Sequence, residues 1–203
     1  MDNKKKMFIK KRLKQASVGI AGAGGLGSNA AIALARIGIG KLVIVDHDKI
    51  EETNLNRQYY FLDQIGKLKI DAIKENIKKI NQDVIVITHD LELKKDKMYV
   101  PFKDVDVIIE ALDKAETKAN FIEEILIKLP DKPIIAASGV TGFGNCDRIK
   151  IRKIGKLTMC YDEKAKSSEE DILLAPRVCL IANWEADLAI EYILGEKYEY
   201  RSE

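Results

Sequence analysis

The stretch GAGGLGS at residues 22–28 constrains the fold of this chain more than any other. It follows the apolar run at residues 17–21 and precedes a run rich in Ala, Ile and Leu at residues 29–39, so it predicts a strand, a glycine turn and a helix. Glycine lets a phosphate approach backbone amides, and a helix start attracts anions. Asp46 ends the next strand, at the spacing of a ribose-binding carboxylate. These features predict a nucleotide-phosphate cradle in a βαβ unit; a turn that serves only helix–sheet packing is the alternative.

Composition and length bound the class of protein. The 203 residues suit one domain, residues 1–203, with a nucleotide-binding α/β core at 15–138 and a C-terminal part at 139–203. The chain is 46% hydrophobic and 33% charged with a net charge of +2, which does not indicate a nucleic-acid binder. Three cysteines without a C-x-x-C pair suit the cytoplasm, and no apolar run approaches the length of about 18 residues that spans a membrane.

Apolar runs and helical periodicities alternate along residues 15–138. This alternation predicts a mainly parallel, doubly wound α/β sheet. Strands are expected at residues 17–21, 41–46, 84–88, 105–111 and 134–138, and helices at residues 25–37, 67–81 and 115–129. The polar stretch at residues 47–64 is too rich in Asn, Asp and Glu for a long regular element.

The two ends of the chain differ from this core. Residues 147–154 alternate apolar and charged side chains, which predicts an exposed antiparallel strand, with a second run at 156–161. The polar loop at 162–170 is the best candidate for a mobile segment, and the last helix is expected at 177–194. The basic amino-terminal segment predicts a short amphipathic helix whose inward side chains are Phe8, Ile9 and Leu13.

Charged side chains near the glycine turn indicate which nucleotide it binds. Arg57 and Lys69 would place two cations near the cradle, and Asp113 follows a strand at the carboxyl edge, where open α/β sheets bind ligands. An acid for the ribose, two cations for phosphates and an acid for a metal suit ATP better than a nicotinamide cofactor. Structural alternatives remain open: a surface ion pair for Arg57, a solvated position for Lys69 with Lys67 in its place, and a helix N-cap for Asp113.

These motifs together resemble the ThiF/MoeB superfamily of ubiquitin-activating-like adenylyltransferases. The matching stretches are GAGGLGS (22–28), DHDKIEETNLNRQ (46–58), IGKLK (65–69) and LDKAETK (112–118), with a weaker match at 174–195. The short length and the missing zinc cysteines look most like the compact ThiF variants associated with thiamine biosynthesis.

The resemblance implies a Rossmann-like ATP-binding domain, usually a homodimer, whose partner is a ThiS-like ubiquitin-fold sulfur carrier ending in Gly-Gly. The carrier's terminal carboxylate would attack ATP to give an acyl-adenylate and pyrophosphate, for thiazole formation. Carried over by motif, the residues that contact ATP phosphates, ribose or the reacting carboxylate are Gly22, Gly24, Gly25, Gly27, Asp46, Asn54, Arg57 and Lys69. Asp113 would bind Mg²⁺, and Asn54 has the alternative of a turn residue.

Departures from the family pattern leave alternatives open. The chain lacks the cysteines for a structural zinc, and Cys160 is the only plausible candidate for a covalent adduct with the carrier. Arg12 lies too close to the first strand for assignment as an arginine that reaches a partner subunit. The alternative functions are the same chemistry on a carrier for molybdopterin, cysteine or tRNA modification, a nicotinamide-dependent oxidoreductase, and a non-catalytic nucleotide-binding scaffold.

Overall fold

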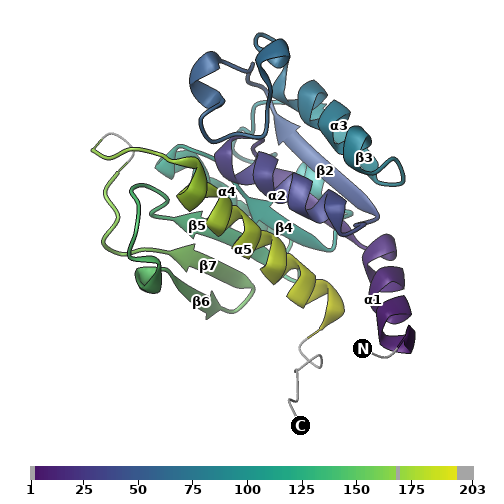
Figure 1. The fold of residues 1–203 in the computed structure, drawn as a ribbon. Coiled ribbons are helices and arrows are strands. Elements are labelled where there is room, and N and C mark those ends of the chain that lie inside the picture. Colours follow the sequence, from purple (N-terminus) through teal and green to yellow (C-terminus); the bar gives the residue numbers. More distant parts are fainter. Residues whose placement is uncertain (1–2, 168–169, 196–203) are drawn as a thin grey trace.

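A computed structural model describes residues 3–167 and 170–195, and in them the chain forms a central sheet with helices on both faces (Figure 1). The sheet has the strand order β3-β2-β1-β4-β5-β7-β6. The strands are β1 (Ser17–Ala21), β2 (Lys41–Asp46), β3 (Ile85–Asp90), β4 (Val107–Glu110), β5 (Ile134–Ser138), β6 (Lys150–Ile154) and β7 (Leu157–Tyr161). The helices are α1 (Asn3–Gln15), α2 (Gly25–Arg36), α3 (Lys69–Ile80), α4 (Ala115–Lys128) and α5 (Ala175–Leu194).

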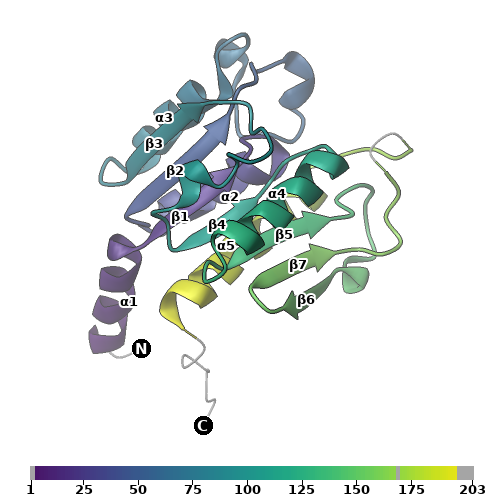
Figure 2. The ribbon, with the colours of Figure 1, turned by 180° about the vertical axis from the view of Figure 1, so that it is seen from behind.

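Two apolar layers enclose the sheet. Helices α2, α3 and α5 cover one face (Figure 1), and α4 covers the other together with the short turn Val100–Phe102 (Figure 2). Strands β1, β4 and most of β2 and β5 are buried, as expected for parallel strands with apolar runs covered on both sides. The predicted doubly wound α/β fold is confirmed.

The chain changes winding direction between β1 and β4. These two strands are parallel neighbours, with Ala21 opposite Glu110, yet their connections leave toward opposite sides of the sheet. The glycine turn follows β1 and Asp113 follows β4, so both lie at the carboxyl edge beside this switch point. Ligands of open α/β sheets bind at such a crevice.

The C-terminal part continues the central sheet. The expected antiparallel pair is present, since β6 and β7 form a hairpin turned at Gly155 with a φ of +59°. Strand β7, however, runs parallel to β5, with Cys160 opposite Ala137. The hairpin places β7 between β5 and β6, so this region is an extension of the sheet edge rather than a separate appendage.

The basic helix α1 lies at the opposite, amino-terminal edge of the sheet. Leu13 is buried and Ile9 packs on the core as expected, but Phe8 is 43% exposed. Arg12 Nη2 donates a hydrogen bond of 2.9 Å to the carbonyl of Ile193, at the end of α5. This bond satisfies a terminal helix carbonyl and holds Arg12 away from the glycine turn.

No helix within residues 3–167 and 170–195 combines the length and the apolar character needed to cross a membrane. The predicted mobile loop at 162–170 lies partly outside the described residues, because these exclude 168 and 169.

Candidate functional site

The glycine turn folds tightly against the end of β4 and the start of α2. Gly22 has a φ of +97°, and a Cβ there would come within 2.6 Å of the Ala111 carbonyl oxygen. A Cβ on Gly27 would overlap the carbonyl oxygen of Gly22. At Gly24, in contrast, the nearest atom to such a Cβ is Gln58 Nε2 at 3.9 Å. The turn therefore needs glycine for its own packing at two positions and leaves space at Gly24.

Asp46 braces this turn from the end of β2. Its Oδ2 accepts a 2.6 Å hydrogen bond from the Ala23 N–H, and its Oδ1 accepts one of 2.8 Å from the Asp48 N–H. The residue is 9% exposed. A carboxylate oxygen has more than one acceptor position, so this bracing role leaves capacity for a ribose hydroxyl.

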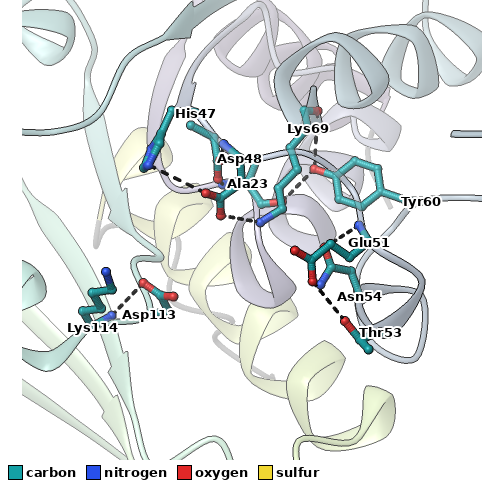
Figure 3. A network of polar contacts seen from close by, with 11 residues as sticks. Ala23, His47, Asp48, Glu51, Thr53, Asn54, Tyr60, Lys69, Asp113 and Lys114 are labelled. Atoms are coloured by element: carbon teal, nitrogen blue, oxygen red, sulfur yellow. Dashed lines mark hydrogen bonds and ion pairs between the residues drawn. The ribbon is translucent and has the colours of Figure 1, made fainter. Parts of the chain in front are cut away.

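Tyr60 holds the same residue of the turn from the other side. Its hydroxyl donates to the Ala23 carbonyl at 2.7 Å and lies 3.4 Å from the Lys69 carbonyl oxygen (Figure 3). Burial raises the pKa of Tyr60 well above its usual value, and Asp46 and Asp48 raise it further, so the hydroxyl keeps its proton. Sequence reasoning missed this residue, because a tyrosine inside a polar stretch carries no motif.

Lys69 lies at the site, in an ion pair with Asp48. Its Nζ is 2.7 Å from Asp48 Oδ2 (Figure 3), and its side chain is 8% exposed where that of Asp48 is 52% exposed. Partial burial of Asp48 opposes its ionisation, but the hydrogen bond and charge of Lys69 outweigh this and lower the pKa of the carboxyl. Lys67, the alternative, points instead to Glu75 at 3.2 Å in an exposed pair.

Arg57 borders the glycine turn. A Cβ on Gly25 would be 3.7 Å from Arg57 Cγ, and the Arg57 carbonyl accepts a 2.9 Å hydrogen bond from Asn29 on α2. Its Nη1 donates to the Thr53 carbonyl at 3.1 Å and to Asn56 Oδ1 at 2.8 Å. These bonds keep the guanidinium within its own turn and beside the cradle.

Asn54 has a structural role in the same segment. Its Oδ1 accepts a hydrogen bond from the Glu51 N–H at 3.1 Å, within the single helical turn Glu52–Asn54. Its carbonyl accepts the N–H of Arg57 at 3.2 Å and that of Gln58 at 2.9 Å. These contacts are those of a turn residue, which was the alternative for Asn54. Through its carbonyl, Asn54 positions the backbone of Arg57.

Asp113 stands apart from this group at the end of β4 (Figure 3). It is exposed, and its Oδ1 accepts a 2.8 Å hydrogen bond from the N–H of Lys114. The N-cap of α4 is Lys114 and makes no side-chain cap, so the alternative of Asp113 as the N-cap is wrong. The turn that carries it is fixed by Glu110, which pairs with Lys118 and accepts the Leu112 N–H at 2.8 Å.

A second candidate for a metal site is the cluster of Asp46, His47 and Asp48, whose possible ligand atoms lie within 4.8 Å of one another. Both Asp46 oxygens already accept backbone N–H groups, and Asp48 is paired with the Lys69 ammonium. A cation there would compete with Lys69, so Asp113 is the better candidate for a divalent metal.

Cys160 does not suit covalent chemistry. It is fully buried on β7, where burial raises the pKa of its thiol to about 12, with Glu185 adding to the effect. The thiolate is the reactive form of cysteine, so the expectation that Cys160 is the adduct candidate is wrong. Cys146 is exposed and Cys179 is half-buried, with its Sγ 3.4 Å from Asn29 Oδ1.

The switch point of the sheet, the glycine turn and the Asp46 carboxylate at the end of β2 define a Rossmann-like nucleotide-binding domain. The particular family follows from the sequence, which matches the ThiF family over residues 5–202. The chain belongs to the ThiF family, and the resemblance stated from the motifs is confirmed.

Relatives and solved structures agree with this assignment. The adenylyltransferase and sulfurtransferase UBA4 of Kluyveromyces lactis is 31% identical over 191 residues, which cover 91% of this chain and 43% of that protein. The chain thus spans less than half the length of this curated relative.

Two solved structures share the fold. The E. coli tRNA N6-threonylcarbamoyladenosine dehydratase TcdA, in complex with AMP, superposes with a TM-score of 0.84 at 20% identity, over 95% of this chain and 91% of that one. E. coli MccB with ATP superposes with a TM-score of 0.72 at 24% identity, over 92% of this chain and 58% of the MccB chain.

Proposed function

We propose that this chain is an ATP-dependent adenylyltransferase that activates the C-terminal carboxylate of an acceptor protein. The observation that carries the proposal is the glycine turn at the switch point, braced at Ala23 by the Asp46 carboxylate. The family match, a relative named as an adenylyltransferase, and the AMP and ATP bound to the structural neighbours support it.

The reaction joins two anions, so charge and positioning dominate its barrier. An oxygen of the acceptor carboxylate forms a bond to the α-phosphorus, the bond to the bridging oxygen of the β-phosphate breaks, and pyrophosphate leaves. In this proposal the amides of the glycine turn hold the phosphates and Asp46 accepts the ribose hydroxyls. Arg57 and Lys69 offset the negative charge, and Asp48 orients Lys69 through their 2.7 Å contact.

Asp113 fits the role of a Mg²⁺ ligand. Its carboxylate is exposed at the carboxyl edge, and Oδ1 alone takes a hydrogen bond from the described residues. Carboxylate oxygens are ligands that Mg²⁺ accepts, usually one or two per site together with phosphate oxygens. The ion would supply charge neutralisation on the phosphates.

We further propose that the acceptor is a ThiS-like ubiquitin-fold carrier ending in Gly-Gly, for thiazole formation, and that the chain works as a cytoplasmic homodimer. The same chemistry on a carrier for molybdopterin, cysteine or tRNA modification remains the alternative. Burial of Cys160 supports release of the acyl-adenylate without a thioester on that residue.

Membership of the ThiF family argues against the oxidoreductase alternative.

The test is ATP–pyrophosphate exchange with Mg²⁺, with and without a panel of Gly-Gly-terminated carriers. We expect exchange with the ThiS-like carrier only, and a loss of about 10²–10³ in rate for Arg57→Ala and for Asp113→Ala, as for other preorganised charge sites. Arg152→Ala, on the exposed strand β6, is the matched control and should keep the full rate. Exchange that is absent with every carrier would favour the non-catalytic scaffold and overturn the proposal.

A further inference from the structure

A second charged cluster lies at the carboxyl edge of the sheet, on the side of β5 and β7. Asp162 directly follows β7, Arg177 belongs to the first turn of α5, and Arg148 ends the short helical turn Cys146–Arg148. One oxygen of Asp162, Oδ2, is shared by Nη2 of both arginines, each at 3.4 Å. These are long contacts for charge-assisted hydrogen bonds.

The two guanidinium groups are under-satisfied. Arg177 is 4% exposed, and its Nε and Nη1 have no hydrogen-bond partner within the described chain. The Nε of Arg148 is likewise buried and unpartnered there. Two positive charges around one carboxylate leave one positive charge in excess. A buried charge without compensation is costly, so the cluster favours a second anion.

The start of α5 adds to this positive field. The helix runs for 20 residues, and its first turn carries no acidic side chain. Its free N–H groups and its dipole attract negative charge. Asp171, a carboxylate shortly before the helix, accepts the N–H of its neighbour Ile172 at 2.8 Å. Within the described chain, Asp162 is therefore the carboxylate that both arginines share.

We propose that Arg148 and Arg177 form a binding site for a small oxyanion, of the carboxylate or phosphate class, separate from the glycine turn. Arg148 provides access from solvent, since its side chain is 36% exposed. Val178, next to Arg177, borders the cradle, because its Cγ1 would lie 3.0 Å from a Cβ on Gly25. Helix α5 therefore contacts the glycine turn through Val178 and the arginine cluster through Arg177. The inference rests on this cluster and not on the ATP chemistry proposed above.

The experiment is isothermal titration of the full chain with inorganic phosphate in one arm and acetate in the other. We expect saturable binding of at least one of them, at least tenfold weaker in Arg148→Gln and in Arg177→Gln. Arg152→Gln makes the same charge change on exposed β6 and should leave the affinity within twofold of the parent. The anion that binds more tightly identifies the class of ligand.

Two further variants distinguish an anion site from a purely structural ion-pair cluster. Asp162→Asn removes the internal competitor and should tighten binding about tenfold, while Asn Oδ1 can still accept the Lys164 N–H that Asp162 holds at 2.9 Å. Loss of binding in Arg57→Ala in place of the two cluster variants would assign the anion to the glycine turn and overturn the inference. If Arg177→Gln fails to fold, the less buried Arg148→Gln still decides. Affinities equal to that of Arg152→Gln in every variant, or no binding of either ion, would show that the cluster is only structural and overturn the inference, whatever the outcome of the exchange assay.

Discussion

The two flanks of the carboxyl edge differ in how they satisfy their polar groups. On the β1–β2 flank, Asp46, Tyr60 and Lys69 each make short bonds to residues of the same flank. On the β5–β7 flank, the buried side chains of Arg177 and Glu185 keep nitrogen or oxygen atoms without partners within the described residues. The charged groups of the first flank are therefore preorganised by their own contacts, and its buried atom without a partner within the described residues is the neutral Gln58 Oε1, whereas the charges of the second flank are not balanced by its own residues.

The largest effect is expected from overfilling the β1–β2 flank. Gly27→Ala places a Cβ on the Gly22 carbonyl oxygen, and Gly22 is tied to β2 by its N–H bond of 2.8 Å to the Val45 carbonyl. We expect a loss of about 3 kcal/mol or more in the free energy of unfolding, the upper end for overpacking, measured by urea denaturation. Gly24→Ala is the matched control and should fold with near-parent stability. Equal stabilities would show that the turn is not rigid.

Glu185→Gln tests the imbalance of the β5–β7 flank. Burial raises the pKa of Glu185 well above its usual value; Lys118 opposes this and Glu110 adds to it. The folded chain then holds a proton that the unfolded chain releases above about pH 4.3, so the parent loses stability as pH rises from there. One proton allows at most about 1.4 kcal/mol per pH unit.

The measurement is the slope of the unfolding free energy against pH between about 4 and about 8, a window that includes the ordinary pKa values of glutamate and histidine. The Glu185→Gln variant should lack this part of the decline and gain relative stability toward the alkaline end. The exposed Glu191→Gln on the same helix should keep the parent slope. A parent slope in Glu185→Gln would mean that Glu185 is ionised in the folded chain.

The smallest effect is expected at the ion pair of Lys69 and Asp48. The pKa of Asp48 is lowered, so its contribution is present above the usual value of 3.8 and is lost as pH falls through and below it. Lys69→Met should abolish this pH-dependent contribution to the free energy of unfolding. The contribution is less than about 1 kcal/mol, because Asp48 is half exposed. Acid titration of the unfolding midpoint would measure it, with Lys67→Met as control. Parallel curves for both variants would contradict the role given to Lys69.

What the sequence could predict was local. The order of strand, glycine turn and helix depends on residues 17–39, and the positions of Arg57, Lys69 and Asp113 follow from motifs close to the ends of their elements. Tyr60 was not predicted, because its role is a hydrogen bond to the Ala23 carbonyl, which is 37 residues away in the sequence. Burial of Cys160 depends on β7 pairing with β5, which no local pattern of the hairpin reveals.

The arginine cluster shows the same limit. Its members come from three segments that meet only in the folded chain, at residues 148, 162 and 177. Charge patterns along the sequence assign each of them to its own loop or helix. The motifs therefore predicted residues that lie beside the glycine turn, such as Asp46 and Arg57, while the contacts of Asn54 within its own turn required the structure.

Strand β6 ends the sheet with an open edge, and all five of its residues are exposed. Such an edge is a template for aggregation, and Ile151 and Ile154 give it apolar side chains. The same strand carries Lys150, Arg152 and Lys153, so a second copy arriving edge to edge would bring like charges together. The basic residues of β6 therefore oppose edge-to-edge pairing with a second copy.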